Sequence, residues 1–259
     1  MNRIEALFER KKENILSIYY TAGYPELEDT TKILQHLQDA GADLIEIGIP
    51  FSDPVADGPT IQESNQTALN NGMSVKKLLQ QLANIRENID VPILLMGYLN
   101  PIMQYGVEAF CKDVAAVGID GLIIPDLPML SYQEDYKAYF EKHGLLNIFL
   151  ITPQTSEDRI RQIDQESKGF IYMVSSASIT GAKSGISDAQ IAYFNRIKAM
   201  RLNTPTLIGF GISDNDTFSK ACEYATGAII GSAFVKLLGN SKDKEKSIKE
   251  YIAQVKGIN

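Results

Sequence analysis

Eight short apolar segments recur along the chain, and they constrain its fold more than any other feature of the sequence. Each is rich in Ile, Val, Leu or Tyr and is bounded by Gly or Pro, which is typical of strands buried on both faces of a parallel sheet. Stretches with the spacing of amphipathic helices separate them. The segments are 15–20, 44–49, 92–97, 121–125, 147–152, 170–175, 206–211 and 228–231.

The intervening stretches carry helix signals. Residues 26–40 and 74–88 each place apolar side chains on one helical face, and helix starts are predicted at 155–158 and 213–216, where Ser, Thr and Asp can accept free backbone N–H groups. Eight strand–helix units within 259 residues predict an α/β fold, a closed (β/α)8 TIM barrel in a single domain, 1–259. A doubly wound open sheet is the alternative.

The N-terminal segment differs from the rest because it precedes the first predicted strand. Ile4, Leu7 and Phe8 have helical spacing, so we expect an extra N-terminal helix and no secretory signal. No run of 18 apolar residues occurs, which argues against a membrane span. The net charge of −7 without a Lys/Arg cluster argues against nucleic acid as a partner.

The two cysteines, Cys111 and Cys222, lie far apart and form no CxxC motif. We interpret them as free thiols of a protein in a reducing environment, and a cytoplasmic location is predicted.

One acid interrupts the second apolar segment. If Ile45, Ile47 and Ile49 face outward against helices, Glu46 faces the barrel interior, because side chains alternate along a strand. An ion pair with an inward cation is the structural alternative, but no Lys or Arg occurs in any of the eight segments. A buried carboxylate with a raised pKa is suited to general acid/base catalysis.

The strand ends restrict the chemistry further. There is no strand lysine for a Schiff base, and neither a GxGxxG motif nor a GK dipeptide occurs. His36 and His143 both fall on predicted helices, away from the strand ends. We therefore expect carboxylate chemistry without a metal or a bound cofactor. Acids such as Asp57 follow the strands at the end where barrel enzymes place their active sites.

Glycines cluster after the last three strands. Thr180-Gly181, Gly209-Phe-Gly211 and Gly231-Ser232 all belong to the same end of the predicted barrel. Glycine lets backbone N–H groups approach a phosphate closely, and a helix N-terminus adds favourable dipole interaction. Together these sites predict a phosphate-bearing small-molecule substrate.

Six motifs carry a resemblance to a known family. IEIGIPFSDPVADGPTIQ, PILLMGYLNPI, IPDLP, GFIYMVSSASITGA, GFGIS and IIGSAFVK occur in that order, and the chain resembles the tryptophan synthase α subunit family over essentially its whole length. The resemblance implies a lyase of tryptophan biosynthesis that cleaves indole-3-glycerol phosphate by a retro-aldol reaction to indole and glyceraldehyde 3-phosphate. It also implies a β-subunit partner that carries pyridoxal phosphate, in an α2β2 heterotetramer.

The resemblance assigns roles to individual positions. Glu46 matches the general acid/base, which protonates indole C3 and takes the proton of the glycerol hydroxyl. Asp57 matches the acid that stabilises charge at the indole N–H. A mobile loop over residues 176–187 is expected to cover the site. The other matching positions are Tyr19, Ile61 and Tyr172 at the indole, Thr180 in the loop, and Gly181, Gly211, Gly231 and Ser232 at the phosphate.

Three other functions compete with this one. Another phosphate-binding barrel, such as a sugar-phosphate isomerase or epimerase, would usually need further acid/base groups or a metal. A catalytically silent regulatory subunit would not need both Glu46 and Asp57. A free-standing indole-releasing lyase would work rapidly without a partner.

Overall fold

A single parallel sheet forms the centre of the molecule in a computed structural model, which describes residues 1–175 and 186–258. Nine strands of this part of the chain pair in the order β5-β4-β3-β2-β1-β9-β8-β7-β6. They are β1 (Ile15–Thr21), β2 (Leu44–Gly48), β3 (Ile93–Met96), β4 (Gly121–Ile123), β5 (Leu146–Ile148), β6 (Leu150–Ile151), β7 (Ile171–Val174), β8 (Thr206–Gly209) and β9 (Gly227–Ile230).

One strand of the barrel is interrupted, and the sheet closes across this interruption. β5 pairs with β4 and β6 pairs with β7, and only Phe149 separates the two in the chain. The Phe149 carbonyl accepts a hydrogen bond from the Tyr172 N–H at 2.9 Å, which bridges the break. β5 and β6 are thus two halves of one barrel strand. The predicted (β/α)8 barrel is confirmed, and the open doubly wound sheet is wrong.

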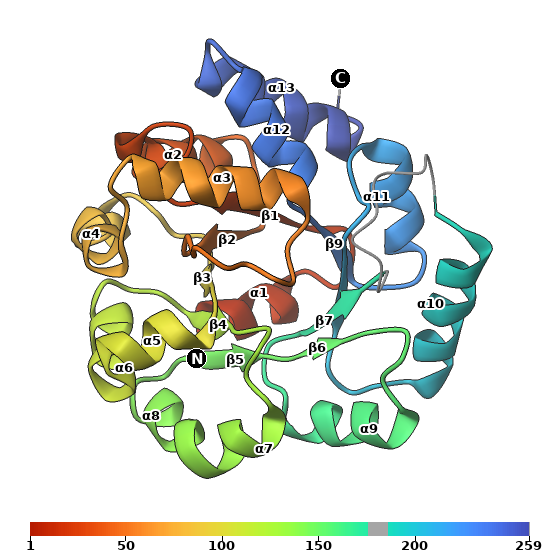
Figure 1. The fold of residues 1–259 in the computed structure, drawn as a ribbon. Helices are drawn as coiled ribbons and strands as arrows, with labels where there is room; N and C mark the ends of the chain where they lie inside the picture. Colours follow the sequence, from red (N-terminus) through yellow and green to blue (C-terminus); the bar gives the residue numbers. More distant parts are fainter. Residues whose placement is uncertain (176–185, 259) are drawn as a thin grey trace.

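Helices surround the strands on the outside, as Figure 1 shows in a view along the barrel. The predicted helix starts are confirmed, with Ser156 capping α9 and Asp214 capping α11. None of the helices in the described ranges is both long and apolar enough to cross a membrane. The helical segments are α1 (Arg3–Arg10), η1 (Leu27–Asp29), α2 (Thr30–Asp39), α3 (Pro59–Asn70), α4 (Val75–Gln81), η2 (Ile85–Glu87), α5 (Leu99–Tyr105), α6 (Val107–Ala116), α7 (Met129–Ser131), η3 (Tyr132–Tyr136), α8 (Lys137–Lys142), α9 (Glu157–Glu166), α10 (Asp188–Met200), α11 (Asn215–Cys222), α12 (Ser232–Asn240) and α13 (Lys244–Lys256).

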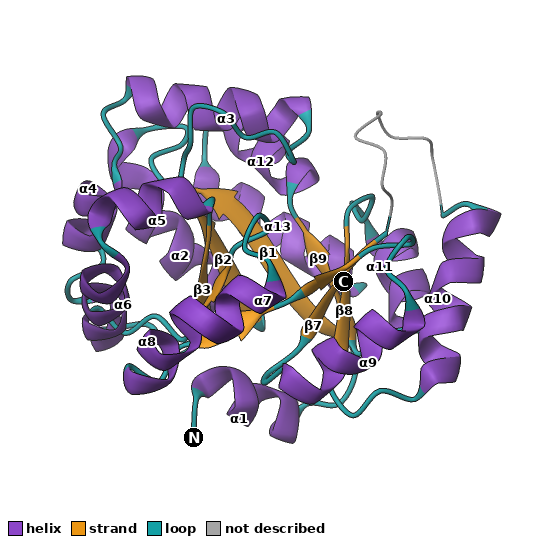
Figure 2. Ribbon diagram, turned by 60° about the horizontal axis from the view of Figure 1, so that its bottom comes forward, coloured by secondary structure: helices purple, strands orange, loops and turns teal. Residues whose placement is uncertain are grey.

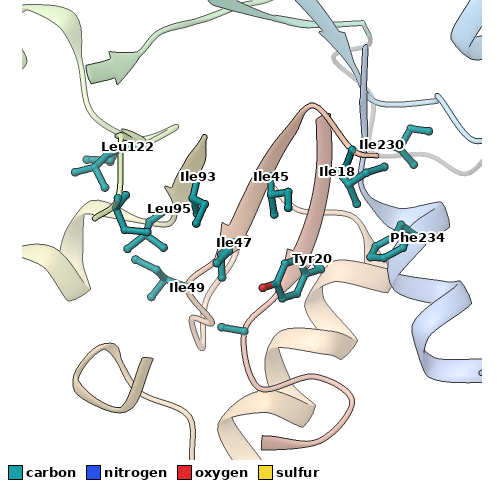
Figure 3. Packing of buried hydrophobic residues seen from close by; sticks show 14 of the residues in the cluster. Ile18, Tyr20, Ile45, Ile47, Ile49, Ile93, Leu95, Leu122, Ile230 and Phe234 are labelled. Carbon is teal, nitrogen blue, oxygen red and sulfur yellow. The ribbon is translucent and has the colours of Figure 1, made fainter. Parts of the chain in front are cut away.

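Apolar side chains pack in two layers, one on each face of the sheet. Ile45, Ile47 and Ile49 belong to the outer layer between strands and helices, where Figure 3 shows them beside Tyr20. Leu44 belongs to the inner layer, which fills the barrel. The alternation expected for this strand is therefore confirmed, and Glu46 occupies the inner face.

The predicted N-terminal helix is α1, and it closes one end of the barrel. Figure 2 shows α1 below the strands, on the side opposite α3. Its Ile4, Leu7 and Phe8 are buried in the inner apolar layer. A capping box between Asn2 and Glu5 begins the helix. Because apolar side chains fill the barrel at this end, the other end, where the strands terminate, is the candidate location of a substrate site.

The packing of α1 generates a stability prediction. Leu7→Ala should lower the free energy of unfolding by about 2–5 kcal/mol, because it removes buried methyl groups and leaves a cavity in the barrel floor. Glu9→Ala changes an exposed position of the same helix and should stay within about 0.5 kcal/mol of the parent. Denaturant unfolding of both variants measures the difference. Equal stabilities would show that α1 does not form the floor.

Candidate active site

Glu46 lies in the middle of β2, on the inner face of the barrel. The strand register places it beside Tyr19 of β1 and Leu94 of β3. Its side chain is fully buried. The position follows from the alternation of the isoleucines around it, since their outward packing leaves the intervening side chain no other direction.

The Glu46 carboxylate has little to compensate its burial. Ser17 Oγ donates a hydrogen bond to Oε1 at 2.7 Å, and Oε2 has no partner among the described residues. Within those residues no salt bridge reaches this acid, so the ion-pair alternative is not supported. Burial raises the pKa of Glu46 to about 7, and the Ser17 hydrogen bond opposes the rise. The group can therefore both hold and release a proton near neutral pH.

Asp57 lies in the loop between β2 and α3 and is held there by a residue from another strand end. Tyr98 Oη donates to Asp57 Oδ2 at 3.3 Å and accepts from the Ala56 N–H at 3.0 Å. Burial raises the pKa of Asp57 to about 6, and the Tyr98 hydrogen bond lowers it. Asp57 is thus the more acidic of the two carboxylates and is mostly ionised at neutral pH.

Phe51 and Val55 are apolar residues of this proline-rich loop, and the sequence predicts that both are exposed near the barrel mouth, but the structure places them differently. Phe51 is half-buried and packs on the ring of Tyr98, with centroids 5.2 Å apart. The expectation for Phe51 is wrong, because a neighbouring strand end supplies an aromatic surface. Val55 is 77% exposed, as expected.

Other acids at the strand ends make local hydrogen bonds, to the backbone or to a neighbouring side chain. Asp126 accepts hydrogen bonds from the N–H of Leu99 at the start of α5, and Asp214 caps α11. Asp53 is exposed and bonds the neighbouring Ser52 hydroxyl. Glu46 and Asp57 are therefore the strand-end acids that combine burial with a strongly raised pKa.

An apolar group includes Tyr19, the register partner of Glu46. Tyr19, Ile61 of α3 and Val235 of α12 pack together, with Met96 at their margin. On the other side of the barrel Tyr172 is buried and faces Phe210 edge to face, with centroids 6.3 Å apart. These side chains form walls suited to a flat apolar ring.

Tyr19 and Tyr172 each occupy the space beside a glycine of the neighbouring strand. A Cβ on Gly48 would lie 2.1 Å from Tyr19 Oη, and one on Gly209 would lie 2.2 Å from Tyr172 Oη. Burial raises the pKa of both tyrosines, and the charges of Glu46 and Asp57 raise it further. Both hydroxyls therefore stay protonated and lie in the field of the two acids.

The glycine-rich side of the barrel mouth presents backbone groups. Phe210 and Gly211 both have left-handed backbone angles, with φ of 71° and 77°, and a Cβ on Gly211 would meet no atom within 4 Å. Gly231 precedes α12, and Ser232 is its first residue, so the free N–H groups of this helix face the same mouth. The arrangement is suited to an anion.

Most of the predicted site residues meet at this end of the barrel. The acids, the apolar wall residues and the glycines after β8 and β9 all lie there, while Thr180 and Gly181 fall outside the described residues, as does 176–185 of the expected loop. No group of metal-ligating side chains occurs in the ranges that the structure describes. Tyr98, Phe210 and Ser175 were not predicted, although each lies at or just beyond the end of an apolar segment.

Comparison with known proteins gives a consistent result. A family model described as "Tryptophan synthase alpha chain" matches residues 6–259. The tryptophan synthase alpha chain of Flavobacterium johnsoniae is 57% identical over 99% of this chain and 100% of its own length. That of Parabacteroides distasonis is 53% identical over 99% and 100%.

Solved structures agree. The crystal structure of the tryptophan synthase alpha chain from Legionella pneumophila superposes with a TM-score of 0.88 at 34% identity, covering 100% of this chain and 97% of that one. Tryptophan synthase from M. tuberculosis in its aminoacrylate-bound form gives 0.85 at 29% identity, with 98% of each chain covered.

The burial of Glu46 generates a prediction about stability and pH. With a pKa near 4.5 when unfolded and about 7 when folded, the native carboxyl binds more protons over this interval, so the free energy of unfolding falls as pH rises through it. Glu46→Gln has no ionisable group at this position, so its free energy of unfolding does not fall in this way. The free energy of unfolding of the variant minus that of the parent should therefore increase by about 3 kcal/mol from pH 4.5 to pH 8. Denaturant unfolding of both proteins across that pH range measures this difference. A difference that does not change with pH would contradict the burial of an acid here.

Proposed function

This chain belongs to the tryptophan synthase alpha chain family, and we propose that Glu46 and Asp57 are the two residues that handle protons and charge in its reaction. It is a lyase that cleaves indole-3-glycerol phosphate to indole and glyceraldehyde 3-phosphate in tryptophan biosynthesis. The C–C bond between the indole ring and the glycerol chain breaks, and no electrons leave the substrate.

Glu46 is assigned both proton transfers. Its protonated form gives a proton to indole C3, which turns the ring into an electron sink. Its carboxylate then takes the proton of the adjacent side-chain hydroxyl. The C–C bond breaks, the electron pair returns to the ring, and the aldehyde forms with the proton back on Glu46. A pKa of about 7 supports this double role, because neither form is strongly favoured at neutral pH.

Asp57 is assigned to the indole nitrogen. Protonation at C3 places positive charge on the ring N–H, which an ionised carboxylate at the barrel mouth would stabilise. Asp57 is half-buried, so its charge is screened less than at an open surface. The hydrogen bond from Tyr98 fixes one carboxylate oxygen and leaves the other for the substrate.

The remaining assignments divide between ring and phosphate. Tyr19, Ile61 and Tyr172 are proposed to hold the indole, and Gly211, Gly231 and Ser232 to donate to the phosphate. Thr180 and Gly181 lie outside the described residues, and their roles, at the aspartate and at the phosphate, are proposed from the sequence alone. Gly209 is proposed to contribute indirectly, because its missing side chain makes room for Tyr172.

The chain pairs with a tryptophan synthase β subunit. We place this partner over the barrel mouth, because Val55 of the Asp57 loop is 77% exposed, and Met103 of α5, the helix after β3, is 55% exposed. An α2β2 assembly and a single domain over residues 1–259 complete the proposal.

A cytoplasmic location is proposed on the basis of the cysteines. Cys111 and Cys222 are both free thiols, which are typical of proteins kept in a reducing compartment.

One observation carries the assignment, the buried Glu46 carboxylate with an unpartnered oxygen. Glu46→Gln should lower the rate of indole release by at least about 10²–10⁴-fold while leaving the fold intact, because the amide keeps the shape but cannot shuttle a proton. Asp57→Asn should also be severely impaired. Asp53→Asn changes an exposed acid of the same loop and should leave the rate near that of the parent.

The assay is run on the purified chain with and without a β subunit, with circular dichroism to confirm folding. Appreciable turnover by folded Glu46→Gln would remove Glu46 from the mechanism. Stimulation by the β subunit is expected, since docking can hold the Asp57 loop in place. Full activity alone would favour the free-standing lyase, and no activity in either case would favour the silent regulatory subunit.

Tyr98 gives a further prediction. Tyr98→Phe removes the donor to Asp57 and the acceptor of the Ala56 N–H, so the pKa of Asp57 should rise above about 6. The acidic limb of the pH–rate profile should shift to higher pH, and the rate of indole release should fall about tenfold or more. Tyr105→Phe breaks a similar half-buried Tyr–Asp bond, between Tyr105 of α5 and Asp113 of α6, and is the matched control. If the pH–rate profiles of Tyr98→Phe and Tyr105→Phe were the same, Tyr98 would have no role in positioning Asp57.

A further inference from the structure

Ser175, the residue directly after β7, makes an unusual pair of contacts with the loop after β8. Its N–H donates to the Gly209 carbonyl at 3.0 Å, and its Oγ donates to the Phe210 carbonyl at 2.6 Å. The side chain is only 2% exposed. One buried residue thus holds two consecutive carbonyl groups of the neighbouring loop.

The second of these contacts decides where the next N–H group points. The peptide between Phe210 and Gly211 is trans, so its C=O and N–H point in opposite directions. Because Ser175 holds the Phe210 oxygen on one side, the Gly211 N–H is directed to the other side, where a Cβ on Gly211 would meet no atom within 4 Å. No acceptor for this N–H occurs within residues 1–175 and 186–258.

The loop needs such a restraint. Phe210 is a bulky residue at φ 71°, a conformation that costs roughly 1–3 kcal/mol when nothing compensates for it. The residue is 40% exposed, and its ring packs against Tyr172 edge to face. The hydrogen bond from Ser175 is therefore a main restraint on this peptide.

The Ser175 hydroxyl is itself oriented by α10. Gln190 Nε2 donates to Ser175 Oγ at 3.3 Å, while Gln190 Oε1 accepts from the Ser187 N–H at 2.9 Å in the capping box that begins the helix. With Oγ already accepting from Gln190, its proton is directed to Phe210. Helix α10, Gln190, Ser175 and the Phe210 carbonyl form one connected chain of contacts.

We propose that Ser175 is a positioning residue for phosphate recognition, which sets the Gly211 N–H toward the substrate phosphate through the Phe210 carbonyl. The inference rests on the proposed function, in which Gly211 donates to the phosphate. Ser175 itself does not contact the substrate. Its loss should weaken recognition of the phosphate and leave the proton transfers at Glu46 unchanged.

Ser175→Ala is the first test. It should raise the KM for indole-3-glycerol phosphate and the Kd for inorganic phosphate about tenfold, the effect of one lost hydrogen bond to a charged group, with kcat changed less than about threefold. The Kd for indole, which has no phosphate, should not change. Ser213→Ala, whose hydroxyl bonds Asp214 in the same loop, is the matched control and should behave as the parent.

Gln190→Glu is the second test and guards against a mere packing effect. Glutamate keeps the capping box, but its carboxylate accepts the Ser175 proton and draws it away from the Phe210 carbonyl. The KM should rise as in Ser175→Ala, and the rise should persist at 0.5 M salt. If salt abolished the rise in KM, the cause would be charge repulsion of the phosphate by the introduced carboxylate, and the orientation of Ser175 by Gln190 would be contradicted.

The outcomes separate this inference from the function on which it rests. Gly211→Val should abolish phosphate recognition if Gly211 is a ligand. A loss in Gly211→Val with unchanged KM in Ser175→Ala would overturn the role of Ser175 alone. No loss in either variant would overturn the placement of the phosphate. Equal weakening of phosphate and indole binding in Ser175→Ala would show general damage to the site and would also overturn the proposal.

Discussion

The parallel register between β1 and β2 is the constraint on which the site depends. It pairs Ser17 with Leu44 and Tyr19 with Glu46, so that the Ser17 hydroxyl, the Glu46 carboxylate and the Tyr19 ring all face the barrel interior. Because side chains alternate along a strand, a shift of one residue would turn Glu46 outward and bring an isoleucine into the barrel. The outer layer of isoleucines, buried under the helices, holds the register against such a shift.

The two acids differ in pKa because their surroundings differ. Glu46 is enclosed by the barrel and receives one hydroxyl hydrogen bond, so desolvation dominates and its pKa reaches about 7. Asp57 lies in a loop at the mouth, is half-buried, and has a pKa of about 6 with Tyr98 as its donor. One carboxyl is thereby able to exchange protons near neutral pH, while the other keeps its charge. Separation of two pKa values by environment is how one site supplies both acid/base and electrostatic catalysis.

The phosphate side of the mouth depends on the backbone. The groups available there are the N–H of Gly211 and those at the start of α12, and backbone groups cannot choose their direction independently of the loop that carries them. Ser175, at the end of the neighbouring strand, orients the Phe210–Gly211 peptide, and Gln190 of α10 in turn orients the Ser175 hydroxyl. For a chain with net charge −7, we propose that the phosphate is held by local orientation of backbone dipoles.

The barrel, the inward direction of Glu46 and the choice of the strand ends as the candidate site all follow from the order of residues alone, because apolar periodicity and strand parity are local properties that burial enforces. The order of residues did not determine the break at Phe149, the packing of Phe51 on Tyr98, or the hydrogen bond from Tyr98 to Asp57, 41 positions away in the chain. Those contacts join residues on different strands. Such residues meet through barrel closure and the register between strands, so the folded arrangement sets which side chains restrain each acid and therefore the pKa of each acid.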